Sequence, residues 1–200
     1  MRLRFATPDD AAAVRAIYAP VVRETAISFA ETPPSVADLR AQIAGDRYPW
    51  LVCEAEEGDA EPNAVVGFAK AGPHKDRAAY RWAVDVSAYV QEGWRGRGVG
   101  TGLYEALLET LAAQRFHLAV AVIALPNPAS VGLHESKGFE RVGTFEAVGY
   151  KRGEWRDVGL WQLSLADRPA DPDEPRPVSA VCDVDRVGAA LDRGAASVDR

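Results

Sequence analysis

The chain has 200 residues, of which 48% are hydrophobic, 26% charged and 8% aromatic, and its formal net charge is −6. This length fits one ordinary domain with an appendage, and the composition excludes collagen-like, coiled-coil and wholly disordered proteins. No apolar run approaches the roughly 18 residues that a membrane-spanning helix needs, and the first residues lack the pattern of a signal peptide. We therefore expect a cytoplasmic protein without a membrane partner, and the negative charge argues against a nucleic-acid partner. With Cys53 and Cys182 as its only cysteines, the chain supports no disulfide framework, and we expect no metal site.

The first half of the chain begins with a strand pattern at residues 3–6. Thr7 and Pro8 then provide a capping residue and an early proline, which favour the start of a helix. Ser35 is the expected N-cap of a second helix. Three strand-like segments follow with two turn-rich stretches between them, namely 50–54, 65–71 and 82–90, with turns at 58–63 and 72–77. These strands predict an antiparallel meander.

The second half contains the clearest helical period of the chain, at residues 99–116. One column of this helix consists of Val99, Leu103, Leu107 and Leu111. The continuous apolar run at 118–125 is typical of a strand covered on both faces, and we expect it to lie parallel to the strand at 82–90. The remaining elements are a short helix at 130–137 and closing strands at 139–148 and 157–165. This order describes an α/β (α+β) domain around a mixed central sheet.

Residues 166–200 differ in composition from the rest of the chain. They contain four prolines, eight acidic residues and five arginines but no aromatic residue. The prolines exclude a helix in the first half of this segment, and little apolar surface is available to offset the entropy of ordering. We therefore expect a Pro/Asp-rich, disordered tail after a domain of residues 1–165. A weak helix at 178–193 that docks on a partner is the alternative.

The segment 91–102 joins the strand at 82–90 to the long helix and contains five glycines and two arginines. Glycines before a helix leave backbone N–H groups unpaired at the positive end of the helix dipole, a place that attracts phosphate. The arginines add charge that can pair with phosphate oxygens. The segment matches neither GxxxxGK[ST] nor GxGxxG, which disfavours ATP and NAD as ligands. The alternative is a flexible turn with solvated arginines.

The pattern Arg95-x-x-Gly98-x-Gly100, after a strand and at the start of an amphipathic helix, resembles the acetyl-CoA pyrophosphate loop of the GNAT N-acetyltransferases. Three further segments are similar to the phosphinothricin and methionine sulfoximine N-acetyltransferase branch: AYRWAVDVSAYV at 79–90, AVIALPNPASVGLHESKGF at 121–139 and AVGYKRGEWRDVGLWQLSL at 147–165. The resemblance covers residues 1–165. It implies the GNAT fold, in which two parallel strands, here 82–90 and 118–125, splay apart to hold acetyl-CoA as co-substrate.

The resemblance also implies a set of coenzyme-binding residues around this splay. Backbone groups of residues 88–90 would pair with the pantetheine arm and the thioester carbonyl, and the glycine loop would hold the pyrophosphate. Asn127 would hold the pantetheine by its amide, and an Asx turn that starts the next helix is the alternative. The expected set is Ala88, Tyr89, Val90, Arg95, Gly96, Arg97, Gly98, Val99, Gly100, Thr101 and Asn127.

Asp85 and His134 are the expected catalytic residues. Asp85 lies where the family usually has a glutamate that contacts the substrate amine or its relay water. A carboxylate with an ordinary pKa of about 3.9 is a poor direct base, so we expect a water relay, with a structural ion pair to a neighbouring arginine as the alternative. His134 lies where many members of the family have a tyrosine near the coenzyme sulfur. An imidazole can accept or donate a proton at neutral pH, and a purely structural histidine is the alternative.

Four residues are the expected contacts of the acceptor substrate: Phe29, Lys75, Arg77 and Tyr80. Phe29 matches an aromatic residue of the acceptor pocket, but Ala30 stands where the phosphinothricin enzymes often have an arginine. Lys75 and Arg77 lie in a loop where the family presents cations to the acidic groups of an amino-acid analogue, and solvated loop charges are the alternative. The missing cation favours methionine sulfoximine or methionine sulfone at least as much as phosphinothricin.

The sequence thus predicts an enzyme that moves an acetyl group from acetyl-CoA to the α-amine of a small amino-acid analogue by direct transfer in a ternary complex. The alternatives are acetylation of a peptide or protein N-terminus or of another small amine, and a CoA-binding module without catalysis. The aromatic residues Tyr150, Trp155 and Trp161 suit a dimer face as well as a core, and we expect a homodimer.

Overall fold

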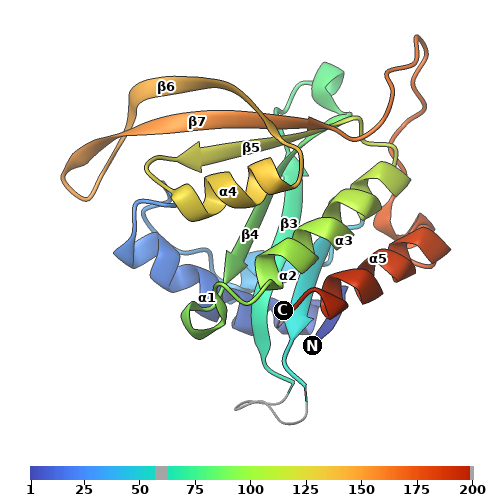
Figure 1. Ribbon diagram of the computed structural model, residues 1–200, viewed down its shortest axis with the longest axis horizontal. Coiled ribbons are helices and arrows are strands. Elements are labelled where there is room, and N and C mark those ends of the chain that lie inside the picture. The colour runs from blue at the N-terminus through green and yellow to red at the C-terminus, as the bar shows by residue number, and fades with distance from the viewer. Residues whose placement is uncertain (57–62, 199–200) are drawn as a thin grey trace.

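The computed structural model describes residues 1–56 and 63–198, and its framework is an open, mixed seven-stranded sheet (Figure 1). The strands lie in the spatial order β1-β2-β3-β4-β5-β7-β6. Their bounds are β1 (Arg2–Phe5), β2 (Trp50–Glu54), β3 (Val65–Pro73), β4 (Ala83–Val90), β5 (Leu118–Ala124), β6 (Glu140–Lys151) and β7 (Glu154–Ser164). The predicted mixed sheet and element order are confirmed. The predicted turn at 58–63 lies, except for Asn63, outside the described residues.

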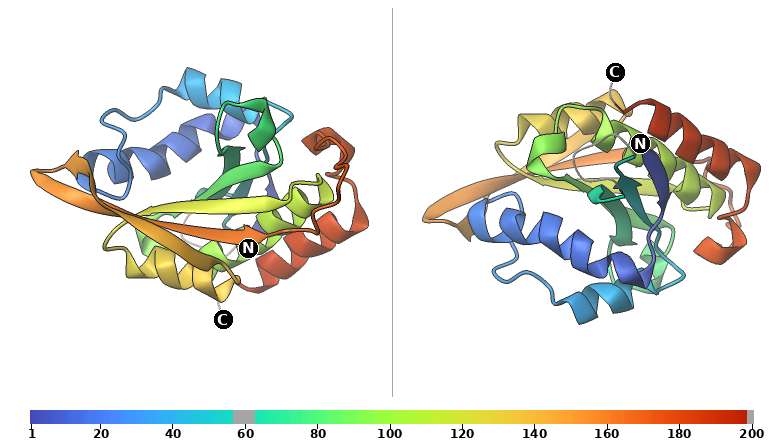
Figure 2. Two further views of the ribbon diagram at one scale, coloured as in Figure 1. Left: turned by 90° about the horizontal axis from the view of Figure 1, so that it is seen from above. Right: turned by 90° about the horizontal axis from the view of Figure 1, so that it is seen from below.

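Helices cover both faces of this sheet (Figure 2). On one face lie α1 (Ala11–Glu24) and α2 (Val36–Ile43), and on the other lie α3 (Val99–Ala113), α4 (Pro128–Ser136) and α5 (Asp185–Ala196). The predicted cap of α2 is confirmed, because Oγ of Ser35 accepts a hydrogen bond from the Asp38 amide at 3.0 Å. The predicted apolar column of α3 is fully buried against the sheet. None of the helices in the described ranges is long and apolar enough to cross a membrane.

The side chains of β4 alternate between the two faces of the sheet. Val84 and Val86 belong to the core under α3, whereas the ring of Tyr89 packs on Phe68 of β3 and Tyr18 of α1, with centroid distances of 5.3 and 4.8 Å. Because successive residues of a strand point to opposite faces, Asp85 projects toward the face that carries α1. The predicted meander is confirmed, since β1 to β4 pair antiparallel.

The parallel pairing of β4 with β5 is short. It begins at Ala83 with Leu118 and ends at Asp85 with Val120. Beyond Asp85 the two strands diverge, while β5 stays paired with β7 along its length. The predicted splay between parallel strands is therefore present, and Asp85 stands at its vertex.

The strands β6 and β7 form a longer hairpin than the sequence suggests. Arg152 and Gly153 connect them, with φ values of 56° and 82°. Two consecutive residues with positive φ are the signature of the tight turns that match the twist of a hairpin. The first strand continues past its predicted end at residue 148 because the turn lies at Arg152 and Gly153. The hairpin extends beyond the rest of the sheet (Figure 1).

Residues 166–198 differ from the predicted disordered tail. After a stretch without helix that contains the four prolines, η4 (Val178–Ala180) and α5 pack on the domain, and Val181 and Val187 are fully buried. The helix α5 lies alongside α3 (Figure 1). The proline-rich stretch also contacts the domain, because Nε1 of Trp82 donates a hydrogen bond to the carbonyl of Asp173 at 2.8 Å. The helix expected as an alternative is therefore present, but it docks on its own chain.

Candidate functional site

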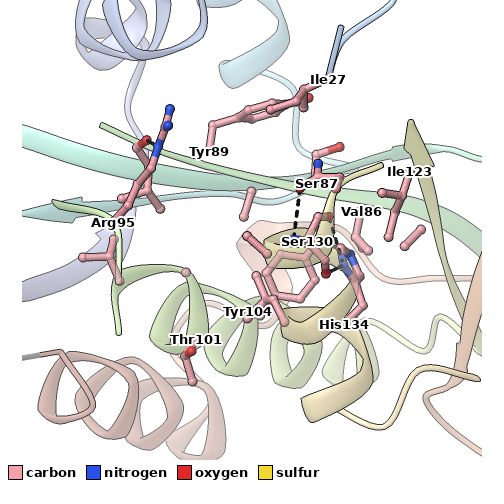
Figure 3. Close-up of a pocket in the computed structure, with 18 of the residues that line it drawn as sticks. Ile27, Val86, Ser87, Tyr89, Arg95, Thr101, Tyr104, Ile123, Ser130 and His134 are labelled. Carbon is pink, nitrogen blue, oxygen red and sulfur yellow. Dashed lines mark hydrogen bonds between the residues drawn. The ribbon is translucent and has the colours of Figure 1, made fainter. Parts of the chain in front are cut away.

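A cleft of about 460 Å³ lies between the diverging strands β4 and β5 (Figure 3). Its walls come from these strands, the segment before α3, the start of α3, and α4. Of the eleven predicted coenzyme-binding residues, all except Arg97 line this cleft. Segments that are up to 39 positions apart, from Ala88 to Asn127, are thus gathered at one place as predicted.

The edge of β4 that faces the cleft offers backbone hydrogen-bonding groups. Ala88, Tyr89 and Val90 pair on one side with β3. On the other side the pairing with β5 has already ended at Asp85. Buried backbone N–H and C=O groups need partners, so this edge suits an extended ligand that takes the place of a neighbouring strand.

The start of α3 forms one end of the cleft and has no side-chain cap. Gly98, the N-cap residue, has a φ of 84°, and no side chain caps the first turn of the helix. Arg95 is positioned beside it, because its Nε donates to the carbonyl of Val90 at 3.2 Å (Figure 3). Arg97 instead places its guanidinium over the ring of Trp94, 4.3 Å from the centroid. The geometry therefore provides helix-dipole amides and one directed cation for an anion.

His134 is buried on α4, and both of its ring nitrogens have partners. Nδ1 lies 2.7 Å from the carbonyl oxygen of Ser130, which can only accept, so Nδ1 carries the hydrogen. Nε2 then accepts a hydrogen bond from the hydroxyl of Tyr104 at 2.7 Å (Figure 3). Burial lowers the pKa of His134, and the bond to Ser130 opposes this shift. His134 is therefore held as a neutral imidazole at the wall of the cleft.

Tyr104 shares this wall and was not predicted as a site residue. Its side chain is fully buried, and burial raises the pKa of its hydroxyl strongly. A buried tyrosine needs a partner for its hydroxyl, which is a signal that points to a polar contact across the α3–α4 interface. The sequence alone cannot identify His134, 30 positions away, as that partner.

Asp85 and His134 lie on opposite faces of the sheet. The carboxylate of Asp85 lies on the α1 face of the sheet at the vertex of the splay, whereas His134 lies on the α3 face. The expected alternative was an ion pair with an arginine; the partner that the structure shows is His74, whose Nδ1 lies 2.7 Å from Oδ1 of Asp85. Burial raises the pKa of Asp85, and the nearby His74 and Lys75 oppose this shift. His74 was not predicted as a site residue, because its proximity to Asp85 depends on the register of β3 against β4.

None of the four predicted acceptor-binding residues lines the cleft. Tyr80 is 44% exposed, and the edge of its ring meets the His74 ring at a centroid distance of 5.8 Å. Lys75 and Arg77 are exposed in the same loop. Phe29 lies against Gly149 of β6, where an added side chain would overlap the ring. From the loop after α1 it is Ile27 that lines the cleft.

Lys151 holds the loop that carries Ile27 and Phe29. From β6 its Nζ donates hydrogen bonds to the carbonyls of Val22 at 2.7 Å, Ser28 at 2.5 Å and Ala30 at 2.8 Å. Three carbonyl acceptors satisfy the three N–H donors of an ammonium group.

Asn127 has a structural role at the start of α4, because its Oδ1 accepts a hydrogen bond from the Ser130 amide at 3.2 Å and caps this helix. The Asx interaction expected as an alternative is thus present, and Asn127 is also one of the residues that line the cleft.

Comparison with known proteins agrees with this geometry. Residues 3–160 match the family model described as acetyltransferase (GNAT) domain. A phosphinothricin N-acetyltransferase of Streptomyces viridochromogenes is 41% identical over 184 residues, which cover 90% of this chain and 96% of that protein. An L-methionine sulfoximine/L-methionine sulfone acetyltransferase of Pseudomonas paraeruginosa is 37% identical over 166 residues, which cover 82% of this chain and 94% of that protein.

A solved structure is similar over nearly the same extent. It is the crystal structure of a GNAT superfamily phosphinothricin acetyltransferase from Sinorhizobium meliloti in complex with AcCoA. The TM-score is 0.79 and the identity 34%, and the match covers 86% of this chain and 92% of that chain.

Proposed function

Because the chain belongs to the GNAT acetyltransferase family, we propose that it transfers an acetyl group from acetyl-CoA to the α-amine of a small amino-acid analogue. Phosphinothricin, methionine sulfoximine and methionine sulfone are the acceptors that the names of its relatives suggest. Transfer is direct, in a ternary complex. The observation that carries this proposal is the cleft between β4 and β5, which ends at the uncapped start of α3.

The proposed coenzyme site rests on two features of the cleft. The open edge of β4 at residues 88–90 fits an extended amide-containing arm such as pantetheine. The amides of residues 98–101 and the guanidinium of Arg95 fit a pyrophosphate. When bound there, acetyl-CoA supplies the acetyl group as a thioester. Backbone N–H groups of β4 at the thioester oxygen would stabilise the negative charge that develops on it.

The proton transfers divide between the two faces of the sheet. An acceptor amine must lose a proton before it attacks, and this step is proposed on the α1 face, where the carboxylate of Asp85 and its partner His74 stand at the vertex of the splay. On the other face, the hydrogen-bonded pair of Tyr104 and His134 lines the cleft and is the proposed source of the proton that the departing sulfur needs. The two faces thus separate removal of a proton from its delivery.

The acceptor is proposed to bind on the α1 face, between the loop after α1 and the loop before β4. Ile27 and Phe29 offer apolar contacts on one side. Lys75, Arg77 and Tyr80 offer cations and a hydroxyl for the acidic groups of the substrate on the other side. Ala30 contributes no charge there, which supports methionine sulfoximine and methionine sulfone as acceptors at least as well as phosphinothricin.

We propose a homodimer through the hairpin of β6 and β7. This hairpin exposes five large apolar side chains: Val142, Phe145, Val148, Tyr150 and Trp155, each 54–65% exposed. Exposed apolar surface of this kind marks contact sites. Trp161, which was expected to suit either a dimer face or a core, is 2% exposed and belongs to the core. Sedimentation of the purified protein tests the proposal, and replacement of Phe145 and Trp155 by serine should yield monomers.

The function is tested with purified protein, acetyl-CoA and a panel of amino acids, by thiol release and by mass spectrometry of the acetylated product. We expect turnover with at least one of the three analogues. Turnover only with peptide N-termini would replace the acceptor class. Coenzyme binding without turnover of any amine would show a binding module instead of an enzyme.

A further inference from the structure

His74 and Asp85 form a pair at the point where the two strands part. In the antiparallel register of β3 and β4, Gly72 faces Asp85 and Pro73 faces Val84, so the next residue of the chain, His74, comes within reach of the Asp85 side chain. Their Nδ1 and Oδ1 atoms lie 2.7 Å apart. Asp85 is the last β4 residue paired with β5, and Val86, directly after it, lines the cleft. The pair therefore stands beside the proposed site of acetyl transfer.

The hydrogen bond determines which nitrogen of His74 can act as a base. An ionised carboxylate can only accept, so Nδ1 carries the hydrogen and Nε2 presents its lone pair. A carboxylate in this position holds an imidazole in one tautomer and stabilises the imidazolium that forms when Nε2 takes a proton. An imidazole ordinarily titrates near neutral pH, whereas a carboxylate ordinarily titrates near pH 4. The imidazole is therefore better matched to general-base catalysis at neutral pH.

The surroundings of the pair suit proton exchange with a substrate and with solvent. The His74 and Asp85 side chains are 23% and 38% exposed. From the neighbouring elements, the titratable groups that interact with the pair within the described residues are Tyr80 on η2 (Ala78–Tyr80) and Lys75 on the same loop. Both belong to the proposed acceptor site. The pair thus lies between the acceptor site and the vertex of the splay.

We propose that His74 is the catalytic base that accepts the proton of the substrate ammonium group, and that Asp85 is the positioning residue that orients its ring. This inference rests on the proposed function and replaces the water relay expected for Asp85. The ammonium group gives one proton to Nε2, and the electrons of that N–H bond stay on the substrate nitrogen. The C–N bond then forms as the C–S bond breaks; the Tyr104–His134 pair gives the departing sulfur its proton and recovers one from the second N–H of the amine. His74 finally releases its proton to solvent through the exposed part of its ring.

The test uses the full chain with the best acceptor and compares pH profiles of kcat and kcat/KM. His74→Phe keeps a ring against Tyr80 but removes the base. At pH 7 we expect kcat to fall about 10²-fold, the typical contribution of general-base catalysis, with unchanged acetyl-CoA affinity by calorimetry. The activity of this variant should rise with pH in parallel with the neutral fraction of the substrate amine and approach that of the unmodified protein at high pH.

Two further variants test the positioning role of Asp85 and provide a control. Asp85→Asn keeps the shape of the side chain, but its amide can donate to Nδ1 and hold the wrong tautomer, so we expect kcat to fall at least about 10-fold while the pH dependence persists. Asp76→Asn removes an exposed carboxylate of the same loop and should leave both profiles unchanged. If His74→Phe keeps kcat within about threefold and an unaltered pH profile, His74 is not the base. Absence of turnover in the unmodified protein would instead overturn the proposed function.

Discussion

Gly102 of α3 and Gly194 of α5 meet back to back, and a β-carbon on either residue would overlap the backbone carbonyl of the other. Contact this close between helix backbones is possible only without side chains. It explains how α5, which has few large apolar residues, nevertheless packs along the main core helix. The last part of the chain is thus joined to the helix whose first turn faces the cleft.

This contact predicts a large stability difference between two similar substitutions. Gly102→Ala should lower the free energy of unfolding by about 1–3 kcal/mol, because overpacking forces the helices apart. Gly188→Ala on α5 is the matched control, since an added β-carbon there meets nothing within 4 Å. Alanine favours helix over glycine, so the control should be neutral or up to about 1 kcal/mol more stable. Urea denaturation measures both, and equal effects would contradict the close contact.

Gly98 combines a positive φ with a close neighbour, because a β-carbon there would overlap the carbonyl of Ser197. A side chain in left-handed backbone costs about 1–2 kcal/mol. We expect Gly98→Ala to raise the KM for acetyl-CoA about 10-fold, which corresponds to about 1.4 kcal/mol. Gly93→Ala, in η3 (Glu92–Trp94), is the control because space is open around it. An unchanged KM in Gly98→Ala would refute the assignment of this loop to the coenzyme.

His134 should affect the rate more than the affinity for coenzyme. We expect His134→Ala to lower kcat about 10²-fold while the dissociation constant of acetyl-CoA changes less than about threefold. His134→Gln retains more of the buried volume, so a loss of kcat in this variant reflects the missing imidazole and not misfolding. Ser136→Ala, at an exposed position of the same helix, is the control. Unchanged kcat in both His134 variants would remove this residue from the mechanism.

His134 also predicts a dependence of stability on pH. Burial lowers its pKa in the folded protein below the ordinary value of 6.5. The unfolded chain then binds the proton more tightly, so the stabilisation is complete above about pH 6.5 and is lost as the pH falls below it. The slope from one group is at most about 1.4 kcal/mol per pH unit. The free energy of unfolding should be measured against pH for the unmodified protein and for His134→Gln. The difference between the two curves should show this slope, and parallel curves would exclude it.

Lys151 should control acceptor binding without touching the acceptor. Lys151→Met removes three hydrogen bonds to the loop after α1, and a hydrogen bond to a charged group contributes about 1.5–3 kcal/mol. We expect the KM for the amino acid to rise about 10-fold and the KM for acetyl-CoA to stay constant. Arg23→Met, at an exposed position near the end of α1, is the control. Equal changes in both KM values would indicate general loosening of the fold.

The parts of the fold that could be predicted depend on local patterns. The periodicity at 99–116, the cap at Ser35 and the glycine loop each reflect interactions between residues close in sequence. The family resemblance then indicates the splay, and ten of the eleven coenzyme-binding residues that it implies line the cleft. These features need no knowledge of which distant segments meet.

The missed features depend on contacts between distant residues. His74 meets Asp85 only through the register of a hairpin, and Tyr104 meets His134 across 30 positions. The docking of α5 on its own chain also depends on which distant segments meet, since Val187 is buried in a cluster with Ala113 of α3 and Gly194 meets Gly102. The composition of this segment therefore predicts disorder, although these contacts order it.

Ser197 and Val198, which follow α5, contact Gly98 at the start of α3. This contact couples the docking of α5 thermodynamically to the glycine loop. A ligand that orders the loop at Gly98 also favours the docked state of α5, by the same free energy with which docked α5 favours the ligand. Saturation with acetyl-CoA should accordingly slow amide hydrogen exchange in α5, a helix that the proposed ligand does not need to touch.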